Sequence, residues 1–305
     1  MAQTKTKTKT ESGAASDYRL GDYMLGIEGL AILRETQYRQ FDRLERRRGE
    51  TQGILGGYGD PPLSNPRGLP EANLDEGYTT WAETYDHPTE QDPDPIQALE
   101  GPLMREHIDG LPDGPVLDAA CGTGRHTAHL IEKGHEVLGV DGNEAMLEKA
   151  KEKIPDAEFK VGDLTKLPAD DGSYGAITCG LAFGHLPDLT PAANELARVL
   201  KPGGTVAISA PHPFITAVLG WRAPVFDAEG NGWEVPEYGH WPGEYVDAFN
   251  DAGLTVRRLI EPPLTSEMAT WNPEAEEGEE NPFAEALIDA LEGQPGVLFW
   301  VAERV

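Results

Sequence analysis

The feature that most constrains the fold is a regular alternation of short apolar runs with helical patterns, which begins near residue 115. Strands that alternate with helices form a mostly parallel sheet covered on both faces, so the sequence predicts an α/β protein. The expected strands are Pro115–Ala119, Glu136–Val140, Ala157–Val161, Ala176–Cys179, Thr205–Ser209, Thr255–Ile260 and Val297–Ala302. The expected helices between them are Gly124–Lys133, Asn143–Lys153, Pro191–Leu200 and Gly243–Ala252.

The rest of the chain divides by composition. Residues 1–15 are a low-complexity tail that we expect to be disordered. Residues 16–75 are expected to form a helical extension that ends in a Gly- and Pro-rich linker, from residue 51 onward. Residues 76–305 then form the main domain, with insertions at about 211–242 and 262–295.

The helical extension carries apolar side chains three and four residues apart between residues 16 and 48. Gly21, Gly26 and Gly29 weaken helix formation, so the sequence predicts a break or two helices there. The basic run 46–48 is expected at a helix C-terminus, where positive charge favours the helix dipole. The apolar stripe is expected to pack on the main domain or on a second subunit, which makes a homodimer possible.

Composition excludes several classes of protein. The chain has 25 Lys and Arg against 53 Asp and Glu, a net charge of −28, which disfavours nucleic acid as a partner. No apolar run is long enough to span a membrane, and the N-terminal residues lack a signal-peptide core. Two cysteines, Cys121 and Cys179, give no disulfide framework, so we expect a cytoplasmic protein.

The most informative segment is the turn after the first predicted strand, which reads Asp-Ala-Ala-Cys-Gly-Thr-Gly from residue 118. Gly122 and Gly124 allow the backbone to turn sharply and approach a ligand. A dinucleotide site requires a third glycine, but Thr127 occupies that position. Asp118 would repel a pyrophosphate, so the turn favours a cationic nucleoside.

Two further acids follow the next strands. Asp141 comes directly after the second strand, where an acid commonly accepts hydrogen bonds from ribose hydroxyls. Asp163 follows the third strand, where a carboxylate and an apolar wall could meet an adenine. Either acid by itself could be only a helix cap or a loop residue, but acids at three successive strand ends favour a nucleoside site.

At this point the sequence resembles the class I S-adenosylmethionine-dependent methyltransferases, in particular the small-molecule group that includes the quinone-biosynthesis enzymes. The resemblance implies a Rossmann-like, seven-stranded sheet whose last strand, here Gly296–Glu303, is antiparallel. The matching segments, in the family's order, are DAACGTGRHT (118–127), GVDGNEAML (139–147), VGDL (161–164), YGAITCGLAFGHLPD (174–188) and LKPGG (200–204).

The resemblance also implies a cofactor site. Asp141 is the implied ribose ligand, Asp163 the adenine amino-group acceptor, and Met146 and Leu164 the residues that pack on adenine. The residues implied around the methionine end and the loops of this site are Asp118, Ala119, Gly122, Gly124, Gly142, Gly162, Gly180 and Leu181.

An aromatic segment before the main domain resembles one that many relatives place over the cofactor. Tyr85 could contact the methionine end, and Trp81 or Tyr85 could present a ring face to the sulfonium. The alternative is that these rings only pack a helix onto the core.

Methyl transfer needs a general base only when the acceptor arrives protonated. His185, His212 and His240 follow predicted strands or lie in the first insertion, and each is a candidate base or a structural histidine. The aromatic insertions are expected to form an acceptor pocket or a dimer contact. No cluster of carboxylates indicates a metal.

The sequence thus predicts methyl transfer from S-adenosylmethionine to a small molecule, with S-adenosylhomocysteine as the product. The acceptor is expected to be aromatic or to carry an amine. The alternatives are an idle S-adenosylmethionine-binding scaffold protein and, further off, a nicotinamide-dependent oxidoreductase.

Overall fold

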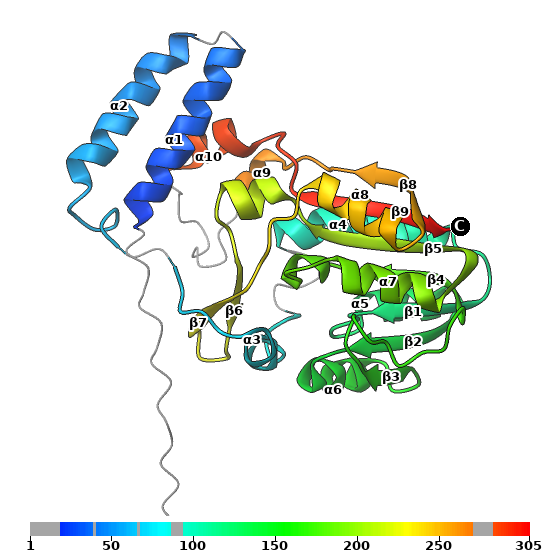
Figure 1. Ribbon diagram of the computed structural model, residues 1–305. Coiled ribbons are helices and arrows are strands. Elements are labelled where there is room, and N and C mark those ends of the chain that lie inside the picture. The colour runs from blue at the N-terminus through cyan, green and yellow to red at the C-terminus, as the bar shows by residue number, and fades with distance from the viewer. Residues whose placement is uncertain (1–18, 39–40, 66–67, 87–93, 271–282) are drawn as a thin grey trace, which may run out of the picture.

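A computed structural model describes residues 19–38, 41–65, 68–86, 94–270 and 283–305. Its centre is a seven-stranded sheet with the strand order β3-β2-β1-β4-β5-β9-β8 (Figure 1). β9 pairs antiparallel with both β5 and β8, and the other pairings are parallel. The α/β class, the seven strands and the antiparallel last strand are therefore confirmed.

The strands and helices agree with the predicted ones to within a few residues, except that the fifth strand is several residues longer. The main-sheet strands are β1 Pro115–Ala119, β2 Glu136–Asp141, β3 Glu158–Val161, β4 Tyr174–Cys179, β5 Leu200–Pro211, β8 Leu254–Ile260 and β9 Val297–Arg304. The helices that follow β1, β2, β4 and β7 are α5 Arg125–Glu132, α6 Glu144–Lys153, α7 Thr190–Val199 and α8 Pro242–Asp251. The remaining α-helices and strands are α1 Leu20–Gln37, α2 Phe41–Gly57, α3 Leu74–Trp81, α4 Pro95–Asp109, β6 Ala223–Phe226, β7 Gly232–Val235, α9 Ser266–Ala269 and α10 Ala284–Leu291.

Both faces of the sheet are buried, which explains why its strands are nearly continuous apolar runs. In β1, Val116 packs with residues of α4 and α5, whereas the next residue, Leu117, packs with residues of α7 and α8. Phe299 and Trp300 divide between the two faces in the same way. In Figure 1, α7 and α8 lie in front of the sheet and α4 lies behind it.

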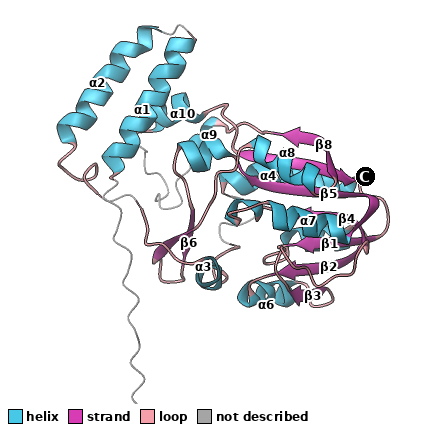
Figure 2. Cartoon of the chain, in the orientation of Figure 1, coloured by secondary structure: helices cyan, strands magenta, loops and turns pink. Residues whose placement is uncertain are grey.

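The carboxyl ends of the parallel strands lie on one side of the molecule. β9 runs in the opposite direction and ends at the C-terminus, marked on the right of Figure 1, so the carboxyl edge is on the left. α3 and the hairpin formed by β6 and β7 lie on that side, and Figure 2 shows this hairpin separate from the main sheet. Gly77 brings α3 close to the hairpin, because a Cβ there would meet Val235 Cγ1 at 2.2 Å.

The N-terminal extension forms two helices, as predicted, but they do not separate at the glycines. α1 is continuous through Gly26 and Gly29, and the two helices separate between Gln37 and Phe41 instead. α2 continues to Gly57, so residues 51–57 are helical and do not belong to a linker. Tertiary packing therefore outweighs the low helix propensity of these glycines.

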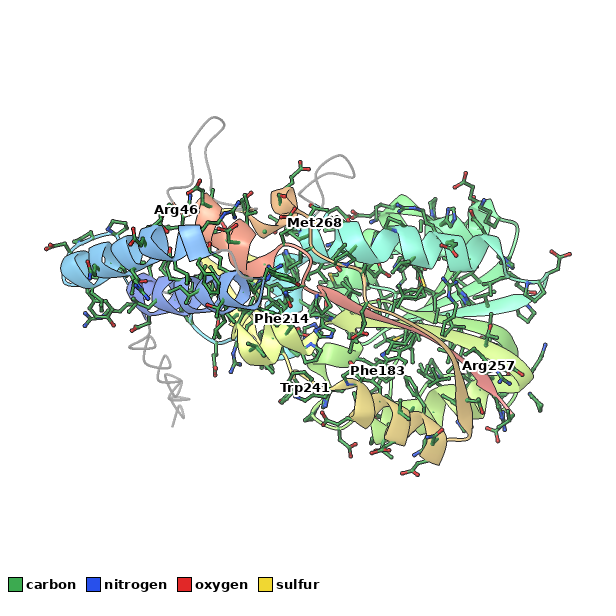
Figure 3. The ribbon with its side chains drawn as sticks, turned by 90° about the horizontal axis from the view of Figure 1, so that it is seen from above. Arg46, Phe183, Phe214, Trp241, Arg257 and Met268 are labelled. Atoms are coloured by element: carbon green, nitrogen blue, oxygen red, sulfur yellow. The ribbon has the colours of Figure 1, made fainter. Side chains whose placement is uncertain are left out.

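The helical extension packs on both insertions. Met24 and Ile27 of α1 share one buried cluster with Ile215 and with residues of α9 and α10. Figure 3 places Phe214 and Met268 between the extension and the sheet. The apolar stripe of α1 thus packs within the chain. The tail 1–15 and the acidic run 274–280 lie outside the described residues.

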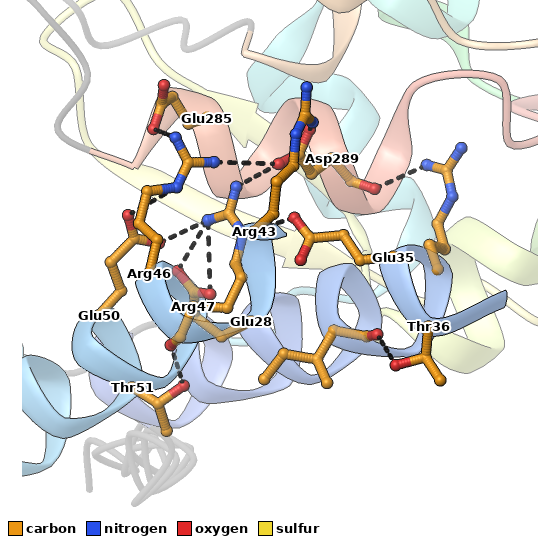
Figure 4. Close-up of polar contacts among 12 residues, drawn as sticks. Glu28, Glu35, Thr36, Arg43, Arg46, Arg47, Glu50, Thr51, Glu285 and Asp289 are labelled. Atoms are coloured by element: carbon orange, nitrogen blue, oxygen red, sulfur yellow. Dashed lines mark hydrogen bonds and ion pairs between the residues drawn. The ribbon is translucent and has the colours of Figure 1, made fainter. Parts of the chain in front are cut away.

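A buried arginine joins α1, α2 and α10 (Figure 4). Arg47 is 0% exposed and pairs with Glu28, Glu35, Glu50 and Asp289. Burial raises the pKa of Glu28 to about 7, although Arg47 opposes this shift. The prediction that the basic run ends a helix was wrong, because Arg47 lies within α2 and is enclosed by carboxylates.

Candidate active site

The turn between β1 and α5 is held in a left-handed backbone conformation. Ala120, Gly122 and Gly124 have φ values of +55°, +53° and +86°. A Cβ on Gly124 would also come within 2.9 Å of Ile154 Cδ1. The turn therefore requires glycine for both conformation and space, and it brings backbone amides to the carboxyl edge of the sheet.

Asp118 lies beneath this turn. Its side chain accepts hydrogen bonds from the hydroxyl groups of Thr127 at 2.6 Å and Thr178 at 2.8 Å, and the residue is 1% exposed. Burial raises the pKa of Asp118, against the effects of His126 and the two hydroxyls. Direct contact with a ligand was the expectation, but burial instead makes Asp118 a brace that ties β1 to α5 and β4.

Two other expected ligands are also buried. Ala119 is 0% exposed and Met146 is 1% exposed. The Met146 methyl group lies under Gly122, where a Cβ would meet it at 3.4 Å. Met146 therefore supports the turn from below and presents no surface for an adenine ring in this conformation.

Asp141 joins three strand ends. Its carboxylate accepts hydrogen bonds from the backbone N–H of Gly122 at 2.8 Å and of Asn143 at 2.9 Å. Its backbone carbonyl accepts from the N–H of Gly162 at 3.0 Å, and Gly142 is exposed beside it. Burial raises the pKa of Asp141, although the amide donors oppose this shift.

Asp163 and Leu164 lie beyond Gly162 at the same edge. Asp163 is exposed, and its carboxylate accepts from both the hydroxyl and the backbone N–H of Thr165, which lower its pKa. Leu164 is half-buried against the core.

The loop after β4 completes the edge. Leu181 has a φ of +57°, uncommon for a residue with a side chain, and its N–H donates to Ser209 on β5. Gly180 precedes it, and a Cβ there would come within 2.9 Å of the His126 ring. This loop is therefore strained and tightly packed at the point where it meets the turn after β1.

A buried charge cluster lies below Gly180, and sequence reasoning missed it. Glu100 of α4 is 0% exposed and contacts Arg125 at 2.8 Å and His126 at 3.0 Å. Burial alone would raise the pKa of Glu100, but His126 and Arg125 lower it to about 2. Arg125 directly follows the glycine turn, a position that could have indicated it. Its side chain is 31% exposed.

Three aromatic rings gather on and after α3. The Trp81 ring lies 4.7 Å from that of Tyr85 and 5.6 Å from that of Tyr78, centroid to centroid. Asn143 holds α3 to the end of β2 through hydrogen bonds to Asp75 and Thr79. The predicted aromatic segment thus lies beside the Asp141 junction.

The turn after α3 is also tied to the glycine turn. The Thr123 hydroxyl donates to Asp86 at 2.9 Å, and Lys153 pairs with the same carboxylate at 2.8 Å. Burial raises the pKa of Tyr85 to about 12, against the effect of Arg125. Tyr85 is therefore neutral at physiological pH, and the guanidinium of Arg125 is close enough to affect its pKa.

The candidate histidines have different surroundings. His212 accepts from the N–H of Phe214 at Nδ1 and contacts Glu261 through Nε2 at 3.0 Å, so its ring caps the following helical turn. His240 is held by the carbonyl of Leu186 at 2.6 Å and by Glu244 at 3.3 Å. Both rings have partners at both nitrogens, and neither ring contacts Tyr78, Trp81 or Tyr85, which favours the structural alternative at these two positions.

Of the three candidate histidines, only His185 contacts one of the rings on and after α3, that of Tyr78. Its Nε2 lies 2.7 Å from the Tyr78 hydroxyl, and its Nδ1 lies 2.7 Å from the Pro236 carbonyl. Burial lowers the pKa of His185. The ring is therefore neutral at physiological pH and lies at the same edge as Tyr85 and Trp81.

The residues at this edge fit S-adenosylmethionine by their chemistry. Asp141 provides a carboxylate for hydroxyl groups, Arg125 a guanidinium for a carboxylate, and Trp81 and Tyr85 provide ring faces for a cation. Among the described residues, no group of three or more His, Cys, Asp and Glu side chains is arranged to hold a metal ion. The described helices also include none that is both long and apolar enough to cross a membrane.

Comparison with known proteins agrees with this geometry. Residues 116–204 match the family of methyltransferase domains. Together with the sheet topology, this match shows that the chain contains a class I S-adenosylmethionine-dependent methyltransferase domain.

Among the relatives, demethylmenaquinone methyltransferase of Beutenbergia cavernae is 35% identical over 108 residues. The match covers 34% of this chain and 45% of the relative, so this chain matches about half the length of that protein.

Solved structures share the fold. An S-adenosylmethionine-dependent methyltransferase from Mesorhizobium loti is 25% identical, with a TM-score of 0.50, over 68% of this chain and 98% of that chain. Geranyl diphosphate C-methyltransferase from Streptomyces coelicolor A3(2), solved with Mg²⁺, geranyl diphosphate and S-adenosyl-L-homocysteine, is 18% identical. Its TM-score is 0.51, over 68% of this chain and 82% of that chain, which shows the fold alone.

Proposed function

We propose that this chain transfers the methyl group of S-adenosylmethionine to a small-molecule acceptor. The observation that carries the proposal is the meeting of Asp141, the glycine turn and the aromatic rings at one point of the sheet. That point lies at the carboxyl ends of β1 and β4, where the strand order reverses and where open α/β sheets bind their ligands.

Each group at the edge has a proposed role toward the cofactor. Asp141 accepts the ribose hydroxyls, and Asp163 with Leu164 binds the adenine. Arg125 pairs with the cofactor carboxylate. Gly180 and Leu181 let the backbone approach the sulfonium, and Trp81 and Tyr85 face its positive charge.

When bound, S-adenosylmethionine supplies a methyl group already activated by positive sulfur. The chain's contribution is then positioning, since holding the reactants in line supplies much of the rate. α3 and the β6–β7 hairpin cover the edge, and their rings exclude water from the reacting atoms. The similarity to demethylmenaquinone methyltransferases supports an aromatic acceptor.

Release of S-adenosylhomocysteine tests this function. The wild-type chain is incubated with S-adenosylmethionine and a panel of small phenols and amines, and we expect product with at least one acceptor. Parallel thermal unfolding with S-adenosylhomocysteine and with NAD distinguishes the cofactor, because a ligand at a hundred times its Kd adds about 2.7 kcal/mol. Stabilisation without turnover would favour a scaffold protein. Stabilisation by NAD instead would contradict the proposal.

A further inference from the structure

A buried carboxyl group, Glu237, lies behind His185 and has no role in the cofactor site. Its side chain is 2% exposed, and Oε2 lies 3.3 Å from Nδ1 of His185. Within the described residues, Oε1 has no hydrogen-bond partner. Oε1 also lies against the backbone of Gly184, where a Cβ would come within 1.8 Å of it. This close approach requires glycine at 184 and fixes the carboxyl group beside the histidine.

The contacts of His185 define its tautomer. Nδ1 faces the Pro236 carbonyl at 2.7 Å, and a carbonyl only accepts, so Nδ1 carries the ring proton. Nε2 then has a free electron pair and accepts from the Tyr78 hydroxyl at 2.7 Å. Tyr78 donates, His185 accepts, and Glu237 lies behind the ring.

The Tyr78 hydroxyl connects this chain of groups to the site. Tyr78 is half-buried, its ring centroid lies 6.4 Å from that of Tyr85, and Asp141 influences its pKa. Burial raises the pKa of Tyr78 well above its ordinary value, so the hydroxyl remains a donor at physiological pH.

We propose that Tyr78, His185 and Glu237 form a proton relay that removes a proton from the methyl acceptor. This inference rests on the methyl transfer proposed above and narrows its substrate class. The acceptor is a molecule whose nucleophilic atom arrives as O–H or N–H, such as a phenol or an ammonium.

The relay balances in atoms and charge. The bond from sulfur to the methyl carbon breaks, the bond from the acceptor atom to that carbon forms, and S-adenosylhomocysteine leaves as a neutral thioether. The acceptor proton passes to the Tyr78 oxygen while the Tyr78 proton passes to Nε2 of His185. The positive charge of the sulfonium is thereby replaced by that of an imidazolium ion beside Glu237, whose carboxylate form stabilises it.

The protonation states give the relay a pH dependence. Burial lowers the pKa of His185 and raises that of Glu237 to about 8. Glu237 is therefore a neutral acid at neutral pH and ionises as the pH rises through about 8, and its negative charge then favours the proton that His185 accepts. The other ionisable groups that face the relay are Tyr245 beside Glu237, and Tyr85, Asp94 and Asp141 toward Tyr78.

Nitrogen NMR of the imidazole ring tests the electrostatic part of the relay without turnover. In the full chain saturated with S-adenosylhomocysteine, the ring nitrogen signals of His185 are expected to shift near pH 8 as Glu237 ionises, and Glu237→Gln should remove this shift. Glu261→Gln, which removes the carboxylate beside His212, is the matched control and should retain the shift. A wild-type His185 signal without a shift near pH 8, or the same shift in Glu237→Gln, would overturn the inference.

Turnover with the phenol and amine acceptors tests the catalytic part. Tyr78→Phe interrupts the relay and is expected to reduce kcat by about 10²-fold, with unchanged affinity for S-adenosylhomocysteine. Tyr58→Phe, which removes a hydroxyl bonded to Asp22 in the helical extension, should leave turnover unchanged. In Glu237→Gln the rise of the rate near pH 8, which follows the ionisation of Glu237, should be absent.

The outcomes separate the two proposals. Full turnover by Tyr78→Phe would overturn the relay and leave methyl transfer standing. Absence of turnover by the wild-type chain with every acceptor would overturn methyl transfer itself, and the relay with it.

Discussion

Thr127 shows how a single residue distinguishes this turn from a dinucleotide-binding one. A dinucleotide site places a third glycine here so that helix and strand can pack closely. In this chain the Thr127 hydroxyl instead donates to Asp118, which also accepts from Thr178. The side chain that replaces the glycine therefore satisfies a buried carboxylate and fixes α5 to β1.

Replacement of Thr127 tests this brace. Thr127→Val keeps the shape of the side chain but leaves one oxygen of buried Asp118 without its donor, which should lower the free energy of unfolding by about 1–3 kcal/mol. Urea unfolding measures the change. Thr165→Val, which removes a similar bond to exposed Asp163, is the control and should change stability by less than about 0.5 kcal/mol. Equal effects at both positions would contradict the brace.

At the scale of elements, α3 is the piece that turns an open sheet edge into a site. It is tied to β2 through Asn143 and packs closely on the β6–β7 hairpin at Gly77. The rings of Tyr78 and Trp81 pack against the buried apolar side chains of this hairpin. The cofactor edge is therefore completed by a segment before the sheet and by an insertion after β5.

Substitution of Gly77 tests whether the position of α3 matters. A Cβ at this position would come within 2.2 Å of Val235 Cγ1, so Gly77→Ala should displace α3 from the hairpin. We expect weaker binding of S-adenosylhomocysteine, measured by isothermal titration calorimetry. Gly26→Ala in α1, where a Cβ meets nothing within 4 Å, should bind as the wild type does. Wild-type affinity in Gly77→Ala would show that α3 does not shape the site.

Sequence reasoning succeeded where local periodicity and side-chain burial agree. The strands of the sheet were predictable because both faces are buried, and the position of Asp141 was predictable because it stands at the end of a strand. The end of α2 was not predictable, because glycines in a sequence suggest a loop and the tertiary packing of the helix cannot be seen there. The contacts of Glu100 and Glu237 were not predictable either, since their partners are distant in the sequence.

At the scale of the whole molecule, the chain contains a methyltransferase domain and one accessory layer. α1 and α2 pack on α9 and α10 and on residues 214–218, so the N-terminal extension and the two insertions form one cluster. Arg47 joins α2 to α1 and α10 at the centre of this layer. Residues 214–218 and the β6–β7 hairpin both lie in the first insertion, so the accessory layer is continuous along the chain with the cover of the cofactor edge.

The central claim is that the carboxyl edge around Asp141 binds S-adenosylmethionine. Its most direct test is calorimetric titration of S-adenosylhomocysteine into the wild-type chain and into Asp141→Ala, with circular dichroism to establish that both are folded. We predict saturable binding by the wild type and a loss of at least about tenfold in affinity in the variant, which corresponds to about 1.4 kcal/mol. No binding by the folded wild type, or equal binding by both chains, would contradict the account.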